Sequence, residues 1–391
     1  MKDDMLVIPN RVRSWFLALG VLSFTSLCLY GGVCWYMADL TRDQALVPNH
    51  DLDERNLVIQ ALDDKQIRLQ ILDPNDGLAY WRYEGVYGLE SAHGYAQVGP
   101  IVEQGADYVV REFKGLQQGQ MAVGDAVRMD SFAFAGDPKS AWNIPFEHRT
   151  YMSAGGEFPA WYVDGPSSRW IIFVHGQNGT MEESLRTLPL WYELGYPALA
   201  ISYRNDAGVP RNDDGYMWYG LTEWQDLEGA VQYALAQGAE DVVLVGYSMG
   251  GGIVVNFLYE SALADKVRGV ILNSPMLSLE ATFDLGARRL GIPAFLGYGA
   301  KALVHWRFGL SWARLNYLSR VQLLQTPILL FHGVPDPTVP VTTSDALAAA
   351  RPDLVQYERS DQAGHVRQWN LNAQQYEARL REFLQTLDDP A

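Results

Sequence analysis

The sequence contains very little cysteine. Only two of its 391 residues are cysteines, Cys28 and Cys34, and both lie in one apolar run near the N-terminus. The rest of the chain therefore cannot form a disulfide framework or a metal site built on thiolates. Basic residues are also scarce, since 30 Lys and Arg stand against 46 Asp and Glu, for a net charge of −16. This balance argues against binding to nucleic acid and against electrostatic capture by anionic lipid.

Charged side chains are absent from residues 14–38. At about 1.5 Å per residue, a helix of this length exceeds the roughly 30 Å hydrocarbon core of a bilayer. Aromatic residues lie toward its two ends, where the membrane interface favours them: Trp15, Tyr30, Trp35 and Tyr36. A signal peptide would have an apolar region of only about 7–15 residues before a cleavage site of small residues, whereas this run ends in Cys-Trp-Tyr-Met-Ala-Asp. We therefore expect an uncleaved, single-pass transmembrane anchor.

The charges that flank this run predict its orientation. Lys2, Arg11 and Arg13 precede it, and only Arg42 follows closely. Because cytoplasmic flanks carry the excess of Lys and Arg, we expect residues 1–13 to form a cytoplasmic N-terminus and the bulk of the chain to lie on the outer face of the membrane. Residues 39–50 are interpreted as a short linker.

Residues 51–145 are typical of a small β-rich subdomain. Short runs of strand-forming residues at 66–72, 107–113 and 126–134 are separated by turns rich in Gly, Asp and Pro. The region has no glycine-rich phosphate loop and no concentration of His with carboxylates. We expect a subdomain that packs on the catalytic domain or spaces it. The alternative is a module that guides substrate or binds a partner.

Strands and helices alternate from about residue 146 to the end. After a hairpin at 148–163, strands are expected at 170–174, 198–203, 242–245, 267–272, 327–331 and 354–358, and helices at 183–194, 222–237, 253–263, 343–350 and 374–387. Such alternation predicts an α/β fold, with a mostly parallel sheet and helices on both faces. Functional residues on such a sheet come directly after strands, at their carboxyl ends.

The pattern Gly246-Tyr247-Ser248-Met249-Gly250 joins the strand at 242–245 to an apolar helix. A turn this tight would force side chains at 246 and 250 into the neighbouring strand or helix, and glycine removes that collision. Ser248 is thus a candidate nucleophile, held out at the carboxyl end of the sheet beside the positive end of a helix. The alternative is a glycine-rich turn that only packs the helix onto the strand.

A serine nucleophile needs a base, usually a histidine oriented by a carboxylate. Of the seven histidines, only His365 follows a credible acid in the chain order Ser, Asp, His. That acid is Asp336, which follows the strand at 327–331 between two prolines that stiffen its loop. The loop after 267–272 offers no acid. Ser248, Asp336 and His365 are therefore the predicted catalytic residues.

Acyl transfer also needs donors for the oxyanion. One should be the backbone N–H of Met249, directly after the nucleophile. The second should come from the glycine-containing loop after the strand at 170–174, and we choose the N–H of Gln177. His175 in the same loop is interpreted as a residue that shapes it, and residues 204–206 as a structural ion pair or turn. This mechanism requires no metal and no cofactor.

Residues from about 146 to 388 resemble the α/β-hydrolase superfamily. They are most similar to membrane-anchored serine hydrolases related to the ABHD12/BEM46 and serine aminopeptidase-like group, in bacterial form. The stretches that carry the resemblance are Val174-His175-Gly176, Ser202-Tyr203-Arg204-Asn205-Asp206, Glu223-Trp224-Gln225-Asp226-Leu227, Gly246-Tyr247-Ser248-Met249-Gly250, Asp336-Pro337-Thr338-Val339-Pro340 and Gly364-His365. The resemblance implies the same roles for Ser248, Asp336 and His365, within a catalytic domain at 146–391.

An insertion at about 277–318 is rich in Leu, Ala, Gly and aromatic residues, and it falls where α/β-hydrolases carry their cap. It is interpreted either as an apolar lid that recognises an acyl or other hydrophobic group or as ordinary helix packing.

The sequence thus predicts a membrane-anchored serine hydrolase that cleaves a carboxylic ester, such as an acyl lipid or an acylated envelope component. One alternative is an aminopeptidase-like amide hydrolase with the same three residues. The other is a non-catalytic, membrane-tethered interaction protein that uses the β-rich region. The expected partners are a small-molecule or lipid-like acyl substrate and the membrane, and no oligomeric state is predicted.

Overall fold

The computed structural model describes residues 10–50, 54–72 and 80–388, with side chains from Trp15 onward. The chain forms two compact units: residues up to Val47 together with Gly286–Ser311, and Pro48–Leu285 together with the chain from Trp312. Residues 1–9 of the predicted cytoplasmic segment 1–13 lie outside the described residues. The predicted boundaries of the accessory and catalytic domains, at 51–145 and 146–391, remain predictions.

The first unit is built on one long helix, α1 (Asn10–Thr41), which a π-helical turn continues through Leu46. Among the described residues it is the one helix that is long and apolar enough to cross a membrane, and the apolar part is not buried. A signal sequence near the N-terminus satisfies the same criteria. The helix extends into the predicted linker 39–50. In this part of the helix, Asp39 forms ion pairs with Arg307 at 2.7 Å and with Arg42 at 3.4 Å.

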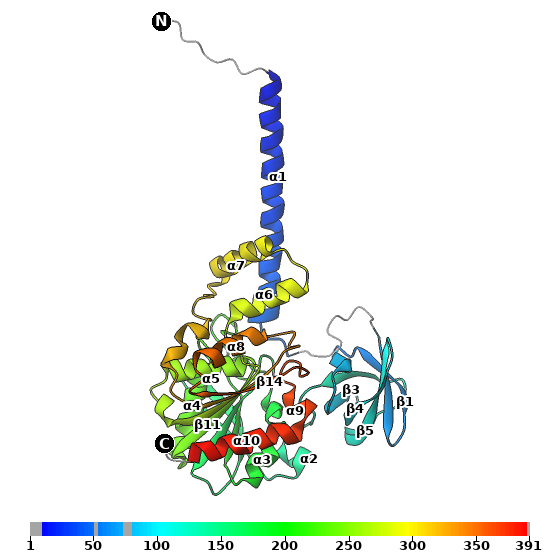
Figure 1. The fold of residues 1–391 in the computed structure, drawn as a ribbon, viewed down its shortest axis with the longest axis vertical. Coiled ribbons are helices and arrows are strands. Elements are labelled where there is room, and N and C mark those ends of the chain that lie inside the picture. Colours follow the sequence, from blue (N-terminus) through cyan, green and yellow to red (C-terminus); the bar gives the residue numbers. More distant parts are fainter. Residues whose placement is uncertain (1–9, 51–53, 73–79, 389–391) are drawn as a thin grey trace. The chain divides into compact units, whose positions relative to one another are not determined.

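The second unit contains the sheet in which Figure 1 labels β11 and β14. This sheet has eight strands, in the order β14-β13-β12-β11-β9-β10-β8-β7. Its strands are β7 (Glu147–Ser153), β8 (Gly156–Val163), β9 (Arg169–Val174), β10 (Ala198–Ile201), β11 (Asp241–Tyr247), β12 (Val267–Asn273), β13 (Ile328–Gly333) and β14 (Val355–Ser360). The six strands from β9 to β14 are parallel. The hairpin β7–β8 adds an antiparallel edge. The predicted α/β fold is confirmed.

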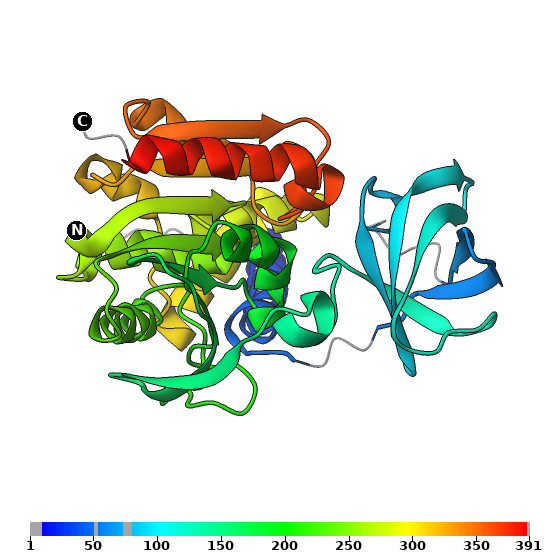
Figure 2. The ribbon, with the colours of Figure 1, turned by 90° about the horizontal axis from the view of Figure 1, so that it is seen from below.

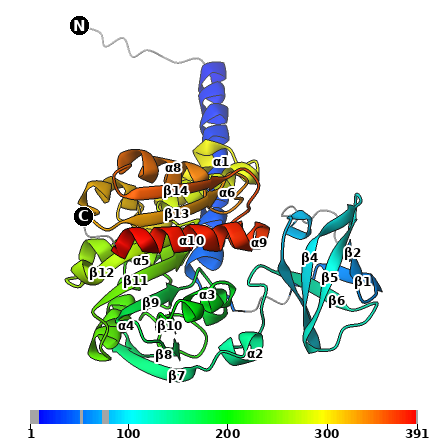
Figure 3. The ribbon, with the colours of Figure 1, turned by 60° about the horizontal axis from the view of Figure 1, so that its bottom comes forward.

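Some of the α-helices that follow α1 cover both faces of this sheet. The α-helices are α2 (Pro138–Trp142), α3 (Leu188–Glu193), α4 (Trp224–Ala236), α5 (Met249–Glu260), α6 (Leu279–Arg289), α7 (Ala294–Phe308), α8 (Val341–Ala350), α9 (Gln368–Leu371) and α10 (Ala373–Asp388). Helices α3 and α10 lie on one face, and α4, α5 and α8 lie on the other (Figure 3). Side chains of β9, β11 and β13 pack with α3 and α10 in one continuous apolar core.

One predicted helix is wrong in detail. The segment 183–194 forms a 3₁₀ helix, Met181–Arg186, and then the short helix α3. The break falls at Thr187, two residues before Pro189. Proline lacks the N–H that a continuous helix would need and is accommodated in the first turn of a new one.

The predicted β-rich region is a closed barrel of antiparallel strands in the order β1-β2-β5-β4-β3-β6 (Figure 2). The strands are β1 (Leu57–Leu62), β2 (Gln66–Ile71), β3 (Tyr87–Ser91), β4 (Gly94–Gln104), β5 (Tyr108–Gly119) and β6 (Ala126–Asp130). Alternate side chains point inward and form a separate apolar core. Pairing of β1 with β6 closes the barrel, so that no strand edge is left open.

Candidate active site

The turn that carries Ser248 joins β11 directly to α5. Ser248 has φ 49° and ψ −114°, a strained conformation that non-glycine residues rarely adopt. A Cβ at Gly250 would lie 2.1 Å from the carbonyl oxygen of Val174, and one at Gly246 would lie 2.8 Å from that of Gly250. The two glycines are therefore required for the reason that the sequence predicts, and the turn holds the serine at the carboxyl end of the sheet.

The structure brings the three predicted catalytic residues together from the ends of β11, β13 and β14. His365 Nε2 lies 2.9 Å from Ser248 Oγ, and His365 Nδ1 lies 2.7 Å from Asp336 Oδ2. When Nδ1–H donates to the carboxylate, Nε2 is the ring nitrogen that accepts the serine hydroxyl. This is the arrangement in which a histidine can remove the proton from an attacking serine.

The carboxylate of Asp336 is fully enclosed and fixed from both sides. Its Oδ1 accepts the backbone N–H groups of Thr338 at 2.8 Å and Val339 at 2.9 Å, while Oδ2 faces His365. Burial opposes its ionisation, but the charge of His365 and the hydrogen bonds from His332 and His365 outweigh that effect and hold the pKa of Asp336 well below its usual range. Asp336 is thus anionic wherever the enzyme is folded near neutral pH.

His332 supports Asp336, and the sequence did not reveal this role. The ring of His332 is fully buried, and its Nε2 lies 3.1 Å from both Asp336 Oδ2 and the carbonyl oxygen of Val339. Its Nδ1 lies 2.7 Å from Ser344 Oγ, so the ring also ties the loop to helix α8. The one sequence signal was a histidine at the end of a strand, four residues before the acid.

The predicted oxyanion donors lie where the chain approaches Ser248. Met249 is the first residue of α5, where N–H groups have no acceptor within the helix. Gly176 lies against the nucleophile, since a Cβ there would be 3.2 Å from Ser248 Cβ, but its N–H donates to Glu183 Oε2 at 2.9 Å. Gln177 follows it, and its side-chain oxygen accepts the hydroxyl of Tyr219 at 3.1 Å. The N–H of Gln177 remains our prediction for the second donor.

The side chains of His175, Arg204 and Asp206 form hydrogen bonds with neighbouring protein groups. The buried ring of His175 lies 2.9 Å from the Gly176 carbonyl oxygen and 2.9 Å from Asp206 Oδ2. Burial opposes protonation of His175, but Asp206 outweighs it and raises the pKa of the ring. Arg204 forms two hydrogen bonds with the buried carboxylate of Asp226, at 2.7 and 2.8 Å. Both groups shape loops beside the site.

Residues 80–86, which precede β3, contact the loop that carries His365. The N–H of Val86 donates to the Asn370 carbonyl oxygen at 2.8 Å, and Asn370 Nδ2 returns a hydrogen bond to the Val86 carbonyl oxygen at 2.7 Å. The guanidinium of Arg367 stacks over the ring of Tyr80, 4.3 Å from its centroid. Sequence patterns gave no indication of this contact, because it joins segments almost 300 positions apart.

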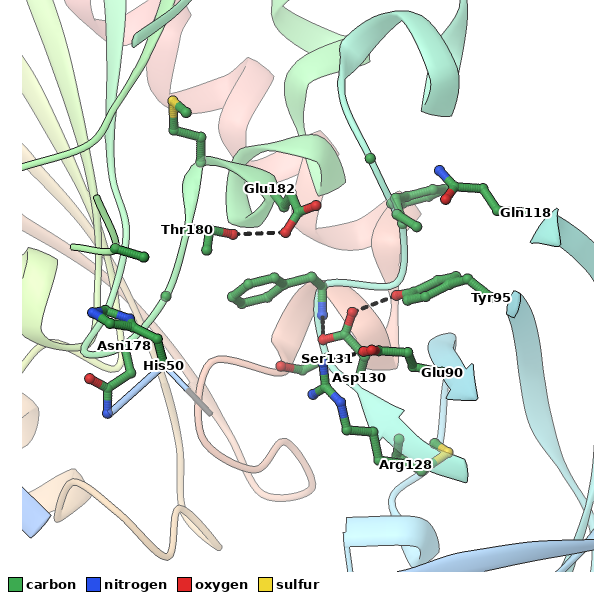
Figure 4. A pocket seen from close by; sticks show the side chains of 18 of the residues that line it. His50, Glu90, Tyr95, Gln118, Arg128, Asp130, Ser131, Asn178, Thr180 and Glu182 are labelled. Carbon is green, nitrogen blue, oxygen red and sulfur yellow. Dashed lines mark hydrogen bonds and ion pairs between the residues drawn. The ribbon is translucent and has the colours of Figure 1, made fainter. Parts of the chain in front are cut away.

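A cleft of about 1160 Å³ lies beside the predicted oxyanion loop and is lined by Gln177 and by residues of the barrel. Figure 4 shows three carboxylates there, those of Glu90, Asp130 and Glu182. Glu90 forms an ion pair with Arg128, Asp130 accepts the hydroxyl of Tyr95, and Glu182 accepts that of Thr180. Burial, and then the nearby charge of Asp130, raises the pKa of Glu182.

The side chains that could bind a metal ion are not grouped in the part of the chain that the structure describes. Within residues 10–50, 54–72 and 80–388, no three side chains of His, Cys, Asp or Glu are grouped so that they could hold a metal ion.

Comparison with protein families finds a match for the part of the chain that carries this site. Residues 171–388, more than half of the chain, match the α/β hydrolase family. The chain belongs to the α/β hydrolase family. Within the barrel, residues 82–130 match a domain of unknown function (DUF8805). No protein of curated function matches the sequence.

Solved structures of the Pyrococcus furiosus esterase Pf2001 are similar in fold to this α/β hydrolase. One is 20% identical with a TM-score of 0.54, and covers 64% of this chain and 94% of its own. A second crystal form is 19% identical with a TM-score of 0.52, and covers 64% of this chain and 96% of its own. At this identity the likeness concerns the fold.

Proposed function

We propose that this α/β hydrolase is a serine esterase that α1 anchors in a membrane. The observation that carries the proposal is the geometry of Ser248, His365 and Asp336, in which the hydroxyl, the imidazole and the enclosed carboxylate lie within hydrogen-bond distance of one another. The esterase with a similar fold favours an ester as the bond cleaved.

The chemistry follows from that geometry. Ser248 Oγ attacks the carbonyl carbon and gives its proton to His365 Nε2, while Asp336 holds the imidazolium. The N–H groups of Met249 and Gln177 bind the oxygen that becomes negative, and each such donor contributes about 10²–10³ in rate. His365 then protonates the departing alcohol, and a water molecule, deprotonated by His365, hydrolyses the acyl-enzyme and regenerates Ser248.

The remaining predictions complete the proposal. The N-terminus lies in the cytoplasm and the catalytic domain, 146–391, on the outer face of the membrane. Within the α/β hydrolases, the chain is a member of the membrane-anchored group of serine hydrolases related to ABHD12/BEM46 and the serine aminopeptidase-like enzymes. Residues 51–145 form the accessory subdomain, and the insertion at about 277–318 forms a cap. The substrate is a lipid-like acyl ester, which suits an enzyme held at a membrane.

An amide hydrolase that acts on substrates with a free amine is the second candidate. The observation that favours it is the cleft in Figure 4, where Asp130 and Glu182 lie close enough for their charges to interact beside the oxyanion loop. A carboxylate there would pair with a substrate ammonium group. In that case the same serine attacks an amide carbonyl, and an amine leaves in place of an alcohol.

The experiment compares wild type and Ser248→Ala on matched p-nitrophenyl esters and aminoacyl anilides, in detergent. We expect ester turnover that rises with acyl chain length and disappears in the variant. Anilide turnover that exceeds ester turnover, and that falls in Glu182→Gln, would instead establish that the protein is an amide hydrolase. Absence of both activities in well-folded wild type would leave the interaction protein as the surviving alternative.

A further inference from the structure

Helix α7 lies against α1 within the first compact unit (Figure 1). The hydroxyl of Tyr30 donates to the Phe295 carbonyl oxygen at 3.0 Å, and the two rings stack with centroids 6.0 Å apart. Cys34 Sγ lies 3.7 Å from the Leu296 carbonyl oxygen. The N-terminal end of α7 therefore lies beside the part of α1 that is proposed to cross the membrane.

A glycine allows this close approach. A Cβ at Gly299 would lie 2.4 Å from the Tyr30 hydroxyl and 2.5 Å from Cys34 Sγ. Small residues at helix contacts of this kind are typical of helices that pack within membranes.

The C-terminal end of α7 lies beside the end of α1 that carries charge. Arg307 forms an ion pair with Asp39 at 2.7 Å, and its guanidinium lies 3.7 Å from the centroid of the Trp35 ring. Trp35 and this ion pair are groups that favour the membrane–water interface. Tyr30 precedes Trp35 by five residues, so it lies about 7 Å further along α1 toward the bilayer centre.

Large apolar side chains on and just before α7 are exposed. Phe295, Tyr298 and Trp306 recur at helical spacing on one face of α7 and are 59%, 68% and 72% exposed, and Leu290 just before the helix is 71% exposed. Isolated apolar residues at a surface are ordinary, but a stripe of this size marks an interaction site. The neighbouring part of α1 exposes apolar side chains in the same way.

The charge of this segment is opposite to that of the chain. The whole chain carries −16, which predicts no attraction to anionic lipid, yet residues 286–311 contain four basic residues and no acidic ones: Arg288, Arg289, Lys301 and Arg307. Arg288 and Arg289 are exposed directly before Leu290. Basic residues near the surface of an anionic leaflet are attracted to it. Basic and aromatic residues together are typical of segments that enter a membrane interface.

We propose that residues 288–298, the insertion tip, enter the headgroup and outer acyl region of an anionic lipid bilayer beside α1. This rests on the proposed membrane anchor, and it deepens that proposal by adding a second, interfacial contact. A bilayer is the occupant because α1 exposes its apolar surface at the same level, because Phe295 is held at the depth of Tyr30, and because the flanking arginines match anionic headgroups. The insertion tip would then hold the insertion at about 277–318 at the membrane surface, where lipid esters are found.

The two native cysteines make a direct test practical. In full-length protein, Cys34→Ala leaves Cys28 near the middle of α1 as the single labelling site. In a Cys28→Ser/Cys34→Ala background, Phe295→Cys and Tyr298→Cys place an environment-sensitive fluorophore, NBD, on the insertion tip. Val123→Cys, an exposed apolar position of the barrel, is the matched control. Each protein is placed in nanodiscs of phosphatidylcholine and phosphatidylglycerol that carry spin-labelled lipid.

We expect lipid spin labels near the headgroup to quench NBD at 295 and 298 at least threefold more than NBD at 123, and labels deep in the acyl chain to quench NBD at Cys28. Cys28 quenched with 295 and 298 reached by aqueous iodide, as at 123, would overturn the insertion and leave the anchor standing. Cys28 unquenched would remove the anchor and the insertion with it. Protection from both iodide and lipid quencher at 295 and 298 would overturn the bilayer in favour of a second copy of the chain.

A second measurement separates lipid contact from folding. Arg288→Ser/Arg289→Ser should weaken quenching at position 298 in anionic discs and leave it unchanged in discs of phosphatidylcholine alone. The same double variant should unfold at the wild-type temperature, because both arginines are exposed. Equal quenching in both kinds of disc, with and without the arginines, would contradict the electrostatic part of the proposal.

Discussion

The eight-stranded sheet and the six-stranded barrel contribute differently to the site. The sheet supplies the proposed reactive groups, because its parallel strands end at one edge and place Ser248, Asp336 and His365 there. The barrel encloses instead a buried arginine, Arg111, which donates hydrogen bonds to the carbonyl oxygens of Trp81, Tyr83, Gly85 and Gly99. Three of those carbonyls belong to residues 80–86, the segment that contacts the His365 loop. The proposed chemistry thus belongs to the sheet, and the barrel contacts one of its loops.

Removing a reactive group of the sheet should have the largest effect. Asp336→Asn keeps the shape of the side chain but removes the charge that orients and stabilises His365, so we expect kcat to fall about 10⁴-fold, as for comparable triad variants. The measurement is steady-state hydrolysis of the preferred ester. Asp345→Asn on helix α8 is the matched control and should keep kcat, because it affects a partly exposed ion pair with Arg359 and a hydrogen bond from the Tyr357 hydroxyl, both away from Ser248. A loss below tenfold in Asp336→Asn would contradict the assigned role.

Breaking the contact between barrel and sheet should have a smaller effect on rate. Asn370→Ala removes the donors to the carbonyl oxygens of Val86 and Ser131 and the acceptor of a hydrogen bond from Arg186, so the loop that carries His365 keeps only part of its attachment to the barrel. A displacement of about 1 Å costs up to 10²-fold in rate, and we expect kcat to fall about tenfold with KM little changed. Unchanged kcat together with an unchanged unfolding temperature would show that the barrel does not support the site.

Replacing the buried arginine of the barrel should lower stability more than chemistry. Arg111→Met leaves several buried carbonyl oxygens without a donor, and we expect the free energy of unfolding to fall by about 3 kcal/mol. Chemical denaturation in detergent is the measurement. The control is Arg68→Met on the neighbouring strand β2, whose guanidinium donates to the exposed Gln60 and lies over the Tyr108 ring but bonds no buried carbonyl oxygen in the contacts described. Equal stability of the two variants would contradict the structural role of Arg111.

The pH dependence of stability should show the smallest effect. Since the folded pKa of Asp336 lies below its unfolded value of about 3.9, its carboxylate stabilises the fold above that value and loses the contribution as pH falls through it toward the folded pKa. The stability difference between wild type and Asp336→Asn should therefore be constant from about pH 5 to 7 and shrink below about pH 4. A difference that stays constant to pH 3 would contradict the lowered pKa.

Local signals in the sequence were sufficient for the sheet and for the three residues that meet at its edge, Ser248, Asp336 and His365. The strand, the tight turn and the helix around Ser248 are contiguous, and the prolines beside Asp336 act on their own loop. Contacts between distant segments were not predictable in this way. The support of Asp336 by His332 depends on a ring orientation, and the attachment of residues 80–86 to Asn370 depends on how a barrel packs. The basic character of residues 286–311 was hidden by the net charge of the whole chain.

Labelling with a fluorophosphonate, followed by mass spectrometry of the peptides, tests the central claim most directly. The reagent forms a covalent bond only with a serine that a base has activated. We predict one adduct on the wild type, at Ser248, and none on Ser248→Ala or on His365→Ala. An adduct at another serine, or no adduct on well-folded wild type, would contradict the proposal that Ser248 is the nucleophile.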